Sequence, residues 1–507
     1  MEQDNILKDQ KKLLVWCVFV FAIIINIYLY VHIQCNFPHL LNDFESPFLS
    51  IAENLYKHGE YSFCDTRDCV PATTVLPVAP IIGYLVFLIF GVGNTALEVI
   101  RVILILSNFG IIIIAYYIGK MFNYKIGCAA AFLAASDLSM FCWGNNFKPD
   151  MLYTFLSTLS LYFLVRFIKC KQSKKNIILA SSFLGLAALT KAGLYMLFYP
   201  IAGFLLVFLL FIKKESFIKS LYYVGLFVVI QLVFIMGWQM RNYHATGVSS
   251  FVSSKVGPLL LNFNCTRLLA YQEGISRDEA REIVNKKYIT EDIMKLNVHE
   301  RNEYLKNIAS KIILNSPLDY AIATLKYSPA LFVGSPPPDY LYTNQRREEL
   351  FEKMGIKLYT EYIYKYNTSL PMVSKREPHY LGVLSSFPIL KKLWNRNQYS
   401  YIFLWSMIKS HLLLIYLMAI IGSILILKNK SDRWVLILMV LIVVYYVTVL
   451  GIGPVASRMR STLMPIFYFL GSYGLIWLGK VLQQFINSRA NFENIRHLRF
   501  GNRYLWK

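Results

Sequence analysis

The chain has 507 residues, of which 56% are hydrophobic and only 16% are charged, and its formal net charge is +22. A soluble globular protein carries about a quarter charged residues, so this composition excludes an ordinary soluble domain, and it equally excludes a disordered, collagen-like or small disulfide-rich chain. The mean hydropathy of +0.44 indicates a polytopic membrane protein instead.

Apolar runs that approach the length needed to span a bilayer recur along the chain. The first run lacks a small-residue cleavage site, so we interpret it as a retained membrane anchor rather than a signal peptide. The expected spans lie near residues 13–33, 98–118, 126–145, 151–168, 177–192, 194–212, 218–238, 403–427, 434–452 and 461–480. The sequence therefore predicts an all-α polytopic protein with about ten transmembrane helices.

The apolar segment Pro71–Val92 is long enough to cross the membrane, but we predict that it does not. Pro71, Pro77 and Pro80 stand in its first half, where proline interrupts a helix. If this segment stays at the membrane surface, the lysine clusters of the short loops all face the cytoplasm, as the positive-inside rule requires. Both termini are then cytoplasmic, and residues 34–97 form an outer loop with re-entrant or juxtamembrane helices.

This topology divides the chain into four parts. Residues 1–238 form an N-terminal transmembrane module, and the polar stretch 239–402 forms an inserted, mostly helical extracytoplasmic domain. Residues 403–482 supply the C-terminal transmembrane helices, and residues 483–507 form a basic cytoplasmic tail. Cytoplasmic loops then account for the net positive charge, so we expect no nucleic acid partner.

Several cations fall on the predicted outer face, which the cations of short loops normally avoid. They are Arg101, Lys148, Lys191, Arg241, Arg458 and Arg460. Each one alone is equally well explained by a long side chain that reaches the interface or by a local ion pair. As a set they favour an anion-binding site at the outer boundary of the membrane, because guanidinium and ammonium groups bind phosphate through charge-assisted hydrogen bonds.

Acidic residues reach the same boundary at two places. Asp43 and Glu45 follow the first span, directly before Phe48–Tyr56, whose apolar residues recur at helical spacing and predict a helix along the membrane surface. Asp150 opens the span near 151–168. Each carboxylate also fits a plain helix N-cap, so both interpretations remain open from the residues alone.

Metal and cofactor motifs are missing from the sequence. Its eight histidines form no pair at metal-binding spacing, and it has no glycine-rich phosphate loop. We therefore expect no cofactor, although Asp43 and Glu45 can share a divalent cation if a third ligand reaches them. A Cys64–Cys69 disulfide is open to the protein only if that loop is extracytoplasmic.

An ordered series of motifs extends over about residues 10 to 480. In chain order it comprises the acidic pair Asp43/Glu45, the loop His58–Ser62, the proline-containing segment from Pro77, Asp150, Gly185–Lys191, Gly237–Tyr243, Asn315–Tyr320 and Ser457–Pro465. The series resembles the type C glycosyltransferases, in particular the bacterial group similar to aminoarabinose transferase and protein O-mannosyltransferase. The elements around Arg241 and Arg458–Arg460 are its most specific marks. The chain departs from the family at Ala72–Pro77, where the family carries an arginine expected to contact the anion.

The resemblance implies an integral-membrane, inverting transfer of a sugar from a polyprenyl-phosphate carrier to a lipid, glycan or protein acceptor. It implies a bacterial inner or plasma membrane, with residues 1–238 as the catalytic module and the active site on the extracytoplasmic face. Asp43 would take the acceptor's proton, Glu45 is the alternative for that role, and Asp150 would be a second acidic group. The implied clamp on the donor phosphate consists of Lys191, Arg241, Arg458 and Arg460.

Two other functions remain open. A lipid-linked polysaccharide ligase or polymerase would also carry outer arginines and a long outer loop, but it would not need an acidic loop directly after the first span. A lipid or glycan transporter would have charged or broken helices at mid-membrane and related halves, and the sequence has no repeated halves.

Overall fold

The computed structural model describes residues 13–28, 47–63, 71–140, 149–170, 172–252, 256–296, 298–333, 398–450 and 457–501. In these ranges the regular structure is helical, and the β-structure is one isolated bridge between Ser62 and Pro71. Six helical segments are long and apolar enough to span a bilayer, which confirms the predicted all-α polytopic fold. They are Asn94–Lys120 (α4), Asp150–Lys169 (α7), Ala192–Ile212 (which contains α9, Phe198–Val207), Phe217–Thr246 (α10), Met407–Lys428 (the greater part of α21, Gln398–Lys428) and Met459–Asn487 (the greater part of α23, Met464–Gly501).

The remaining four predicted spans form shorter helices. They are Leu13–Tyr28, α5 (Tyr124–Ala135), α8 (Lys174–Ala188) and α22 (Arg433–Leu450). The predicted span 126–145 is not one continuous helix, because α5 ends at Ala135 and the backbone turns at Ser136 and Asp137. The Asp137 carboxylate and the Ser136 hydroxyl form side-chain hydrogen bonds at this point, and such bonds compete with the backbone hydrogen bonds of a helix.

The first helix and α4 are antiparallel neighbours. Phe19 stacks edge-on against Tyr116, with 5.9 Å between ring centroids, and the Asn108 side chain donates to Asn26 Oδ1 at 3.1 Å. The chain therefore leaves the first helix and enters α4 at the same end of the bundle. Buried amide pairs of this kind hold membrane helices together.

Two short helices, α2 (Pro47–His58) and α3 (Val78–Phe90), lie between the first helix and α4. They have 12 and 13 residues, so each is only about 18–20 Å long, whereas the hydrocarbon core is about 30 Å thick. The predicted spans α5 and α8 have only 12 and 15 residues, so length alone does not decide whether α3 crosses, and the re-entrant or juxtamembrane loop stays a prediction. The predicted helix Phe48–Tyr56 lies within α2.

The prolines of this loop do not interrupt a helix, so that part of the prediction is wrong. Pro71 and Pro77 precede α3, and Pro80 is its third residue. The first turn of a helix has no intrahelical acceptor for its N–H groups, so proline loses nothing there. Helix α3 packs closely on α2, because a Cβ on Gly83 would lie 2.9 Å from the Ala52 Cβ.

The described part of the inserted domain is a cluster of helices, as predicted. It contains α11 (Val256–Leu259), α12 (Thr266–Gln272), α13 (Arg277–Tyr288), α14 (Glu291–Lys295), α15 (Val298–Asn315), α16 (Pro317–Tyr327) and α17 (Pro329–Val333). A small core of its own includes Leu261, Val284 and Leu305. The predicted boundary at 239 falls inside α10, which continues to Thr246.

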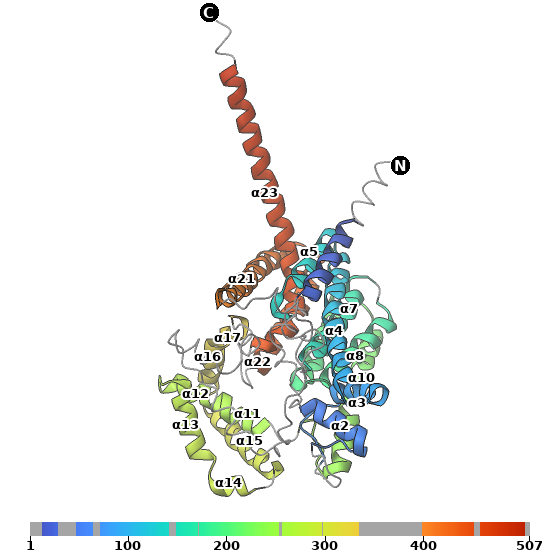
Figure 1. Cartoon of the computed structure of the whole chain (residues 1–507), viewed down its shortest axis with the longest axis vertical. Coiled ribbons are helices and arrows are strands. Elements are labelled where there is room, and N and C mark those ends of the chain that lie inside the picture. Colours follow the sequence, from blue (N-terminus) through green and yellow to red (C-terminus); the bar gives the residue numbers. More distant parts are fainter. Residues whose placement is uncertain are drawn as a thin grey trace, which may run out of the picture.

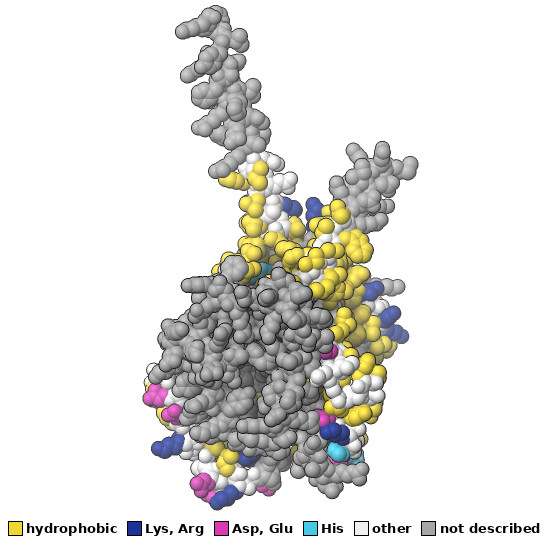
Figure 2. Space-filling model, viewed as in Figure 1, with side chains coloured by type: hydrophobic (Ala, Val, Ile, Leu, Met, Phe, Trp, Pro, Cys, Tyr) yellow, Lys and Arg dark blue, Asp and Glu magenta, His cyan; other side chains and the backbone are white. Residues whose placement is uncertain are grey.

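Different helices lie at the two ends of the bundle. Helices α2 and α13–α15 lie at one end, whereas the first helix and the far end of α23 lie at the other (Figure 1). Hydrophobic side chains cover much of the visible described surface of the bundle, and charged side chains lie around the inserted domain, along one edge of the bundle and near the end that bears the first helix (Figure 2). The assignment of both termini to one side of the membrane stays a prediction.

The lysine-rich turns assigned to the cytoplasm meet at one end of α7. Lys169 forms an ion pair with Asp432 in the α21–α22 turn, and its ammonium lies 4.8 Å from the ring centroid of Phe122, just after α4. Three turns that are distant in sequence thus converge there. Asp150 marks the opposite end of α7.

Cysteine labelling tests which end faces the cytoplasm. In a background from which all eight native cysteines are removed, we expect a membrane-impermeant maleimide to label Lys295→Cys in intact cells. We expect it to label Lys213→Cys only after the membrane is opened, because the positive-inside rule assigns that lysine to the cytoplasm. Labelling of Lys213→Cys in intact cells would contradict the topology.

Helices α21 and α23 cross with their backbones in close approach. A Cβ on Gly422 would lie 1.8 Å from the Leu470 carbonyl oxygen, and one on Gly474 would lie 2.2 Å from the Met418 carbonyl oxygen. Small residues permit such crossings in membranes.

We expect Gly422→Ala to lower the free energy of unfolding by about 1–3 kcal/mol, because the helices must separate to admit the methyl group. Gly225→Ala is the matched control, since nothing lies within 4 Å of a Cβ at Gly225 and alanine favours the helix. Thermal unfolding in detergent provides the measurement. Equal stability of the two variants would show that the crossing tolerates a methyl group.

Candidate functional site

A buried ion pair joins Asp150 to Lys191. Asp150 is the first residue of α7 and is 3% exposed, and its Oδ1 lies 2.5 Å from the Lys191 ammonium. Lys191 follows the end of α8 in an extended conformation, which lets its side chain reach across to α7. The N-cap of α7 is Pro149, so Asp150 is not itself the N-cap, and its carboxylate is paired with the Lys191 ammonium.

The turn that carries the predicted arginine motif covers this pair. The 3₁₀ segment η7 (Ser457–Leu463) brings Met459 Sδ to 3.2 Å from the Lys191 ammonium. Thr154, one turn along α7 from Asp150, donates its hydroxyl to Ser461 at 3.3 Å. Three distant parts of the chain, α7, the end of α8 and η7, therefore meet at the pair. The side chain of Arg458 lies outside the described residues.

Arg460 is turned towards the inserted domain. Its NH1 donates to the Phe332 carbonyl oxygen of α17 at 2.9 Å, and the residue is 1% exposed. The Tyr416 hydroxyl of α21 donates to the same oxygen at 3.0 Å. The Phe332 ring packs edge-on against Tyr416 and Phe467. Arg460 thus links η7, α17 and α21.

Arg241 holds the outer loop. It donates through NH1 to the Ala72 carbonyl oxygen at 2.8 Å and through NH2 to that of Tyr61 at 3.4 Å. Its guanidinium carbon lies 4.7 Å from the ring centroid of Tyr61 and 5.0 Å from that of Trp238. Burial raises the pKa of the Tyr61 hydroxyl well above its ordinary value, and the charge of Arg241 opposes part of that rise.

The loop held by Arg241 continues to the ion pair. Six residues after Ala72, the Val78 N–H donates to the Leu189 carbonyl oxygen at 3.2 Å, two residues before Lys191. The segment 72–78 therefore connects Arg241 to the end of α8. It includes Ala72–Pro77, where the chain departs from the pattern that it resembles, and Arg241 contacts the backbone carbonyl of Ala72 at its start.

The structure brings some predicted site residues together and leaves others apart or outside its description. Asp150 and Lys191 are in direct contact, with the Arg458–Arg460 turn against them. The contacts above direct Arg241 to the outer loop and Arg460 to α17. Asp43, Glu45 and Lys148 lie outside the described residues.

Arg101 supports the simpler explanation of an out-of-place cation. Its guanidinium is fully buried, and NH1 lies 2.8 Å from Glu98 Oε1, one turn earlier on α4. A local ion pair of this kind needs no bound anion.

Sequence reasoning missed a buried polar cluster at the break after α5. Asp137 is 3% exposed and accepts from the Tyr468 hydroxyl at 2.6 Å and from the Ser139 hydroxyl and N–H at 2.6 and 2.9 Å. Next to it, the Ser136 hydroxyl lies 2.9 Å from His411 Nε2. A lone carboxylate inside an apolar run is the signal that points to such a site, and Asp137 stands inside the predicted span 126–145.

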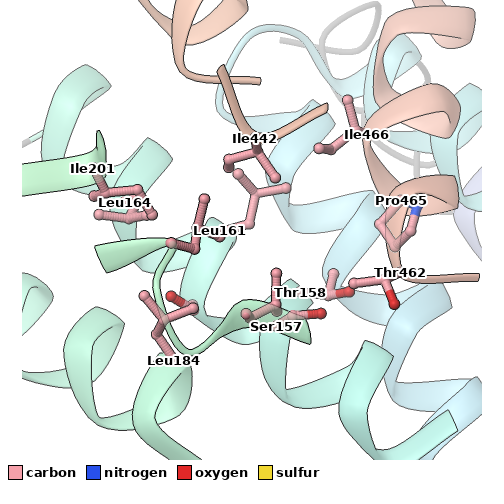
Figure 3. Close-up of a pocket in the computed structure, with 13 residues that line it drawn as sticks. Ser157, Thr158, Leu161, Leu164, Leu184, Ile201, Ile442, Thr462, Pro465 and Ile466 are labelled. Atoms are coloured by element: carbon pink, nitrogen blue, oxygen red, sulfur yellow. The ribbon is translucent and has the colours of Figure 1, made fainter. Parts of the chain in front are cut away.

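A small cavity lies among the helices close to η7. Ser157, Thr158 and Thr462 form its polar side, and Leu161, Leu184 and Ile442 are among its apolar walls (Figure 3). Its volume of about 30 Å³ accommodates one or two water molecules. A sugar is much larger, so this cavity is not the sugar site.

The described residues contain no group of three or more His, Cys, Asp or Glu side chains arranged to hold a metal ion. Asp43 and Glu45, the pair considered for a divalent cation, are not among them. The chemistry that the described site offers is therefore a carboxylate paired with an ammonium group, under a turn that carries two arginines.

Comparison with known proteins confirms the resemblance for part of the chain. Residues 73–238 match the family described as dolichyl-phosphate-mannose-protein mannosyltransferase, which is a family of type C glycosyltransferases. This stretch contains Asp150 and Lys191. Arg241 and the two carbonyl groups that it contacts, those of Tyr61 and Ala72, lie just outside it. A search of curated proteins finds no match.

Two solved structures with a similar course of the chain are distant in sequence. The oligosaccharyltransferase of Archaeoglobus fulgidus in the apo form is 13% identical, with a TM-score of 0.48 over 95% of this chain and 52% of that one. ArnT from Cupriavidus metallidurans bound to undecaprenyl phosphate is 12% identical, with a TM-score of 0.35 over 89% of this chain and 76% of that one. The chain thus spans about half the length of the archaeal enzyme.

Proposed function

We propose that this protein is an inverting glycosyltransferase that moves a sugar from a polyprenyl-phosphate carrier to a lipid, glycan or protein acceptor. The observation that supports it most is the family match over residues 73–238, together with the buried Asp150–Lys191 pair inside that stretch. We place the reaction at the extracytoplasmic face of a cell membrane, where the predicted topology puts both residues. Membrane lipids surround the protein, and no cofactor is part of the proposal.

The proposed reaction is a single displacement. The acceptor oxygen attacks the anomeric carbon, the bond from that carbon to the phosphate oxygen breaks, and the acceptor's proton passes to a carboxylate. Because phosphate is a good leaving group at neutral pH, the enzyme needs one base and fixed positive charge rather than the two carboxylates of a glycoside hydrolase. We assign the base to Asp43, with Glu45 as its alternative.

The positive charge comes from Lys191 and the η7 turn. The Lys191 ammonium is held by Asp150, so it is oriented before the donor binds. A phosphate that approaches beneath η7 would share this ammonium and meet Arg458, whose planar group suits bidentate phosphate contacts. Arg460 would join the clamp by leaving the Phe332 carbonyl oxygen that it contacts here. Arg241 belongs to this set as the residue that positions the outer loop, with a direct phosphate contact as its alternative role.

Replacing Asp43 by asparagine tests the proposal most directly. We expect transfer from a polyprenyl-phosphate sugar to fall by about 10²–10⁴-fold, the range for a missing general base. Donor binding and protein yield should persist, because an amide has the same shape and the residue is predicted to lie at the water boundary. Normal turnover in Asp43→Asn with an inactive Glu45→Gln would move the base to Glu45, and normal turnover in both would refute the assignment.

One observation bears on the transporter alternative. A broken helix with a buried carboxylate, as at Asp137, is typical of transporters, but both Asp137 oxygens already accept hydrogen bonds from Tyr468 and Ser139. A carboxylate satisfied in this way stabilises the helix packing and needs no cargo ion. Mass analysis of envelope glycans with and without the gene distinguishes the classes, since loss of one sugar at one attachment point supports transfer.

A further inference from the structure

Three helices of the inserted domain meet around a buried arginine. Arg267 of α12 is 2% exposed. Its Nε donates to the Phe263 carbonyl oxygen at 3.0 Å, and its NH2 donates to Asn264 Oδ1. Its NH1 is fully buried and, among the described residues, has no hydrogen-bond partner. A buried N–H of a charged group without an acceptor is costly.

A second arginine stands beside it. Arg277, the first residue of α13, is half-buried, and its guanidinium carbon lies 5.4 Å from the ring centroid of Tyr327 on α16. Its Nε is also buried without a partner in the described part of the chain. Burial lowers the pKa of the Arg267 guanidinium to about 10, and the nearby charge of Arg277 acts in the same direction. Both groups remain cationic at neutral pH.

Two acidic side chains of these helices have contacts of their own, although the charge of Asp278 also opposes part of the fall in the pKa of Arg277. Asp278 lies 3.6 Å from Arg281 on the same helix, and Asp319 of α16 accepts from the Gln272 amide at 2.8 Å. No ion pair found among the described residues includes Arg267 or Arg277. Two cations close to each other and partly removed from water need a counter-charge, and the described protein supplies none in contact with them.

We propose that Arg267 and Arg277 form a binding site for a phosphate group, either as the free ion or as part of a lipid head group. Two guanidinium groups match the charge of a phosphate dianion and supply paired donors in the planar geometry that it accepts. Arg277 opens α13, a helix of 12 residues, so the positive end of the helix dipole adds to the attraction. Because Arg277 is only half-buried, the anion enters the site from the side on which Arg277 lies. The site lies in a different part of the fold from the Asp150–Lys191 pair.

Thermal unfolding of the full chain in detergent tests the site. The background carries Lys191→Gln, which removes an ammonium of the other proposed phosphate site. We expect inorganic phosphate to raise the unfolding midpoint by several degrees more than sodium chloride of equal ionic strength, because a ligand that binds only the folded state stabilises it. Arg277→Gln should remove this difference. Lys295→Gln, at an exposed lysine of neighbouring α14, should retain it.

A second arm identifies the source of the phosphate. The same variants are compared in nanodiscs of phosphatidylcholine with and without phosphatidic acid. A rise of the midpoint that depends on phosphatidic acid and on Arg277 supports a lipid head group, and a rise only with soluble phosphate supports the free ion. Arg267→Lys, which keeps the charge but not the planar fork, should bind phosphate at least tenfold more weakly. If phosphate and chloride act alike, or if Arg277→Gln responds as its background does, the proposal is overturned.

Discussion

Replacement of Lys191 by methionine is expected to lower the free energy of unfolding by about 3 kcal/mol and to abolish measurable transfer. The stability loss arises because Asp150, whose side chain is 5% exposed, would remain buried without its counter-charge, and breaking a buried pair from one side costs about 3–5 kcal/mol. Lys191 is 21% exposed, so water partly replaces it and the lower end of that range applies. Thermal unfolding in detergent measures the effect.

The double variant separates structure from chemistry. In Asp150→Asn/Lys191→Met no charge remains buried, so most of the lost stability should return. Transfer should not return, because the donor phosphate has lost its ammonium group. A double variant that recovers both stability and transfer would show that Lys191 serves only to neutralise Asp150.

The ion pair at the other end of α7 provides a matched control. Lys169 and Asp432 form a similar partly buried pair, but at the end of the helix opposite Asp150. Lys169→Met should destabilise the protein comparably while each folded molecule keeps its rate of transfer. A comparable loss of transfer in Lys169→Met would mean that destabilisation alone explains the Lys191 result.

Replacement of Arg241 by alanine is expected to lower the turnover number by about 10–100-fold. The variant loses two donors to loop carbonyls and two cation–π contacts, and hydrogen bonds of a charged group contribute about 1.5–3 kcal/mol each. Arg241→Lys should recover only part of the rate, because an ammonium group cannot reproduce the planar fork. Steady-state kinetics with a polyprenyl-phosphate sugar measures both variants.

The kinetic pattern distinguishes the two roles open to Arg241. If it positions the loop between Tyr61 and Ala72, the turnover number falls and protease cleavage within that loop becomes faster, with KM for the donor little changed. If it binds the donor phosphate directly, KM rises and cleavage is unchanged. Met240→Ala, at the adjacent and exposed position, is the control and should behave as the wild type.

The spans of α4, α7 and α10 could be predicted because long apolar runs give a high mean hydropathy. The course of Pro71–Val92 at the membrane surface, which the alternation of loop charge indicates, stays a prediction. The break at Asp137 could not be read from hydropathy, because one carboxylate hardly changes the average of an otherwise apolar run. The partners that satisfy it, such as Tyr468, come from the far end of the chain.

The candidate site could be predicted as a set of residues but not as a set of contacts. Charge sorting assigns Lys191 and Asp150 to the same face, yet their direct contact depends on how α8 ends against α7, 41 residues away. Charge sorting assigns Arg241 to the same face equally well. Its observed partner, however, is the backbone carbonyl oxygen of Ala72, and the order of side chains in the sequence does not predict contacts to backbone atoms. Backbone acceptors therefore explain most of the difference between the predicted clamp and the observed contacts.

The two ion pairs on α7 also relate the protein to the thickness of its membrane. With 20 residues the helix is about 30 Å long, which equals the average hydrocarbon thickness. Lys191 is bound to one end and Asp432 to the other, so α7 cannot correct a hydrophobic mismatch by tilting independently of the helices that carry these residues. In bilayers with longer or shorter acyl chains, the lipids around α7 must stretch or compress, at a modest free-energy cost per ångström of mismatch. The acyl-chain length of the host membrane therefore affects the stability of the Asp150–Lys191 contact at the end of α7.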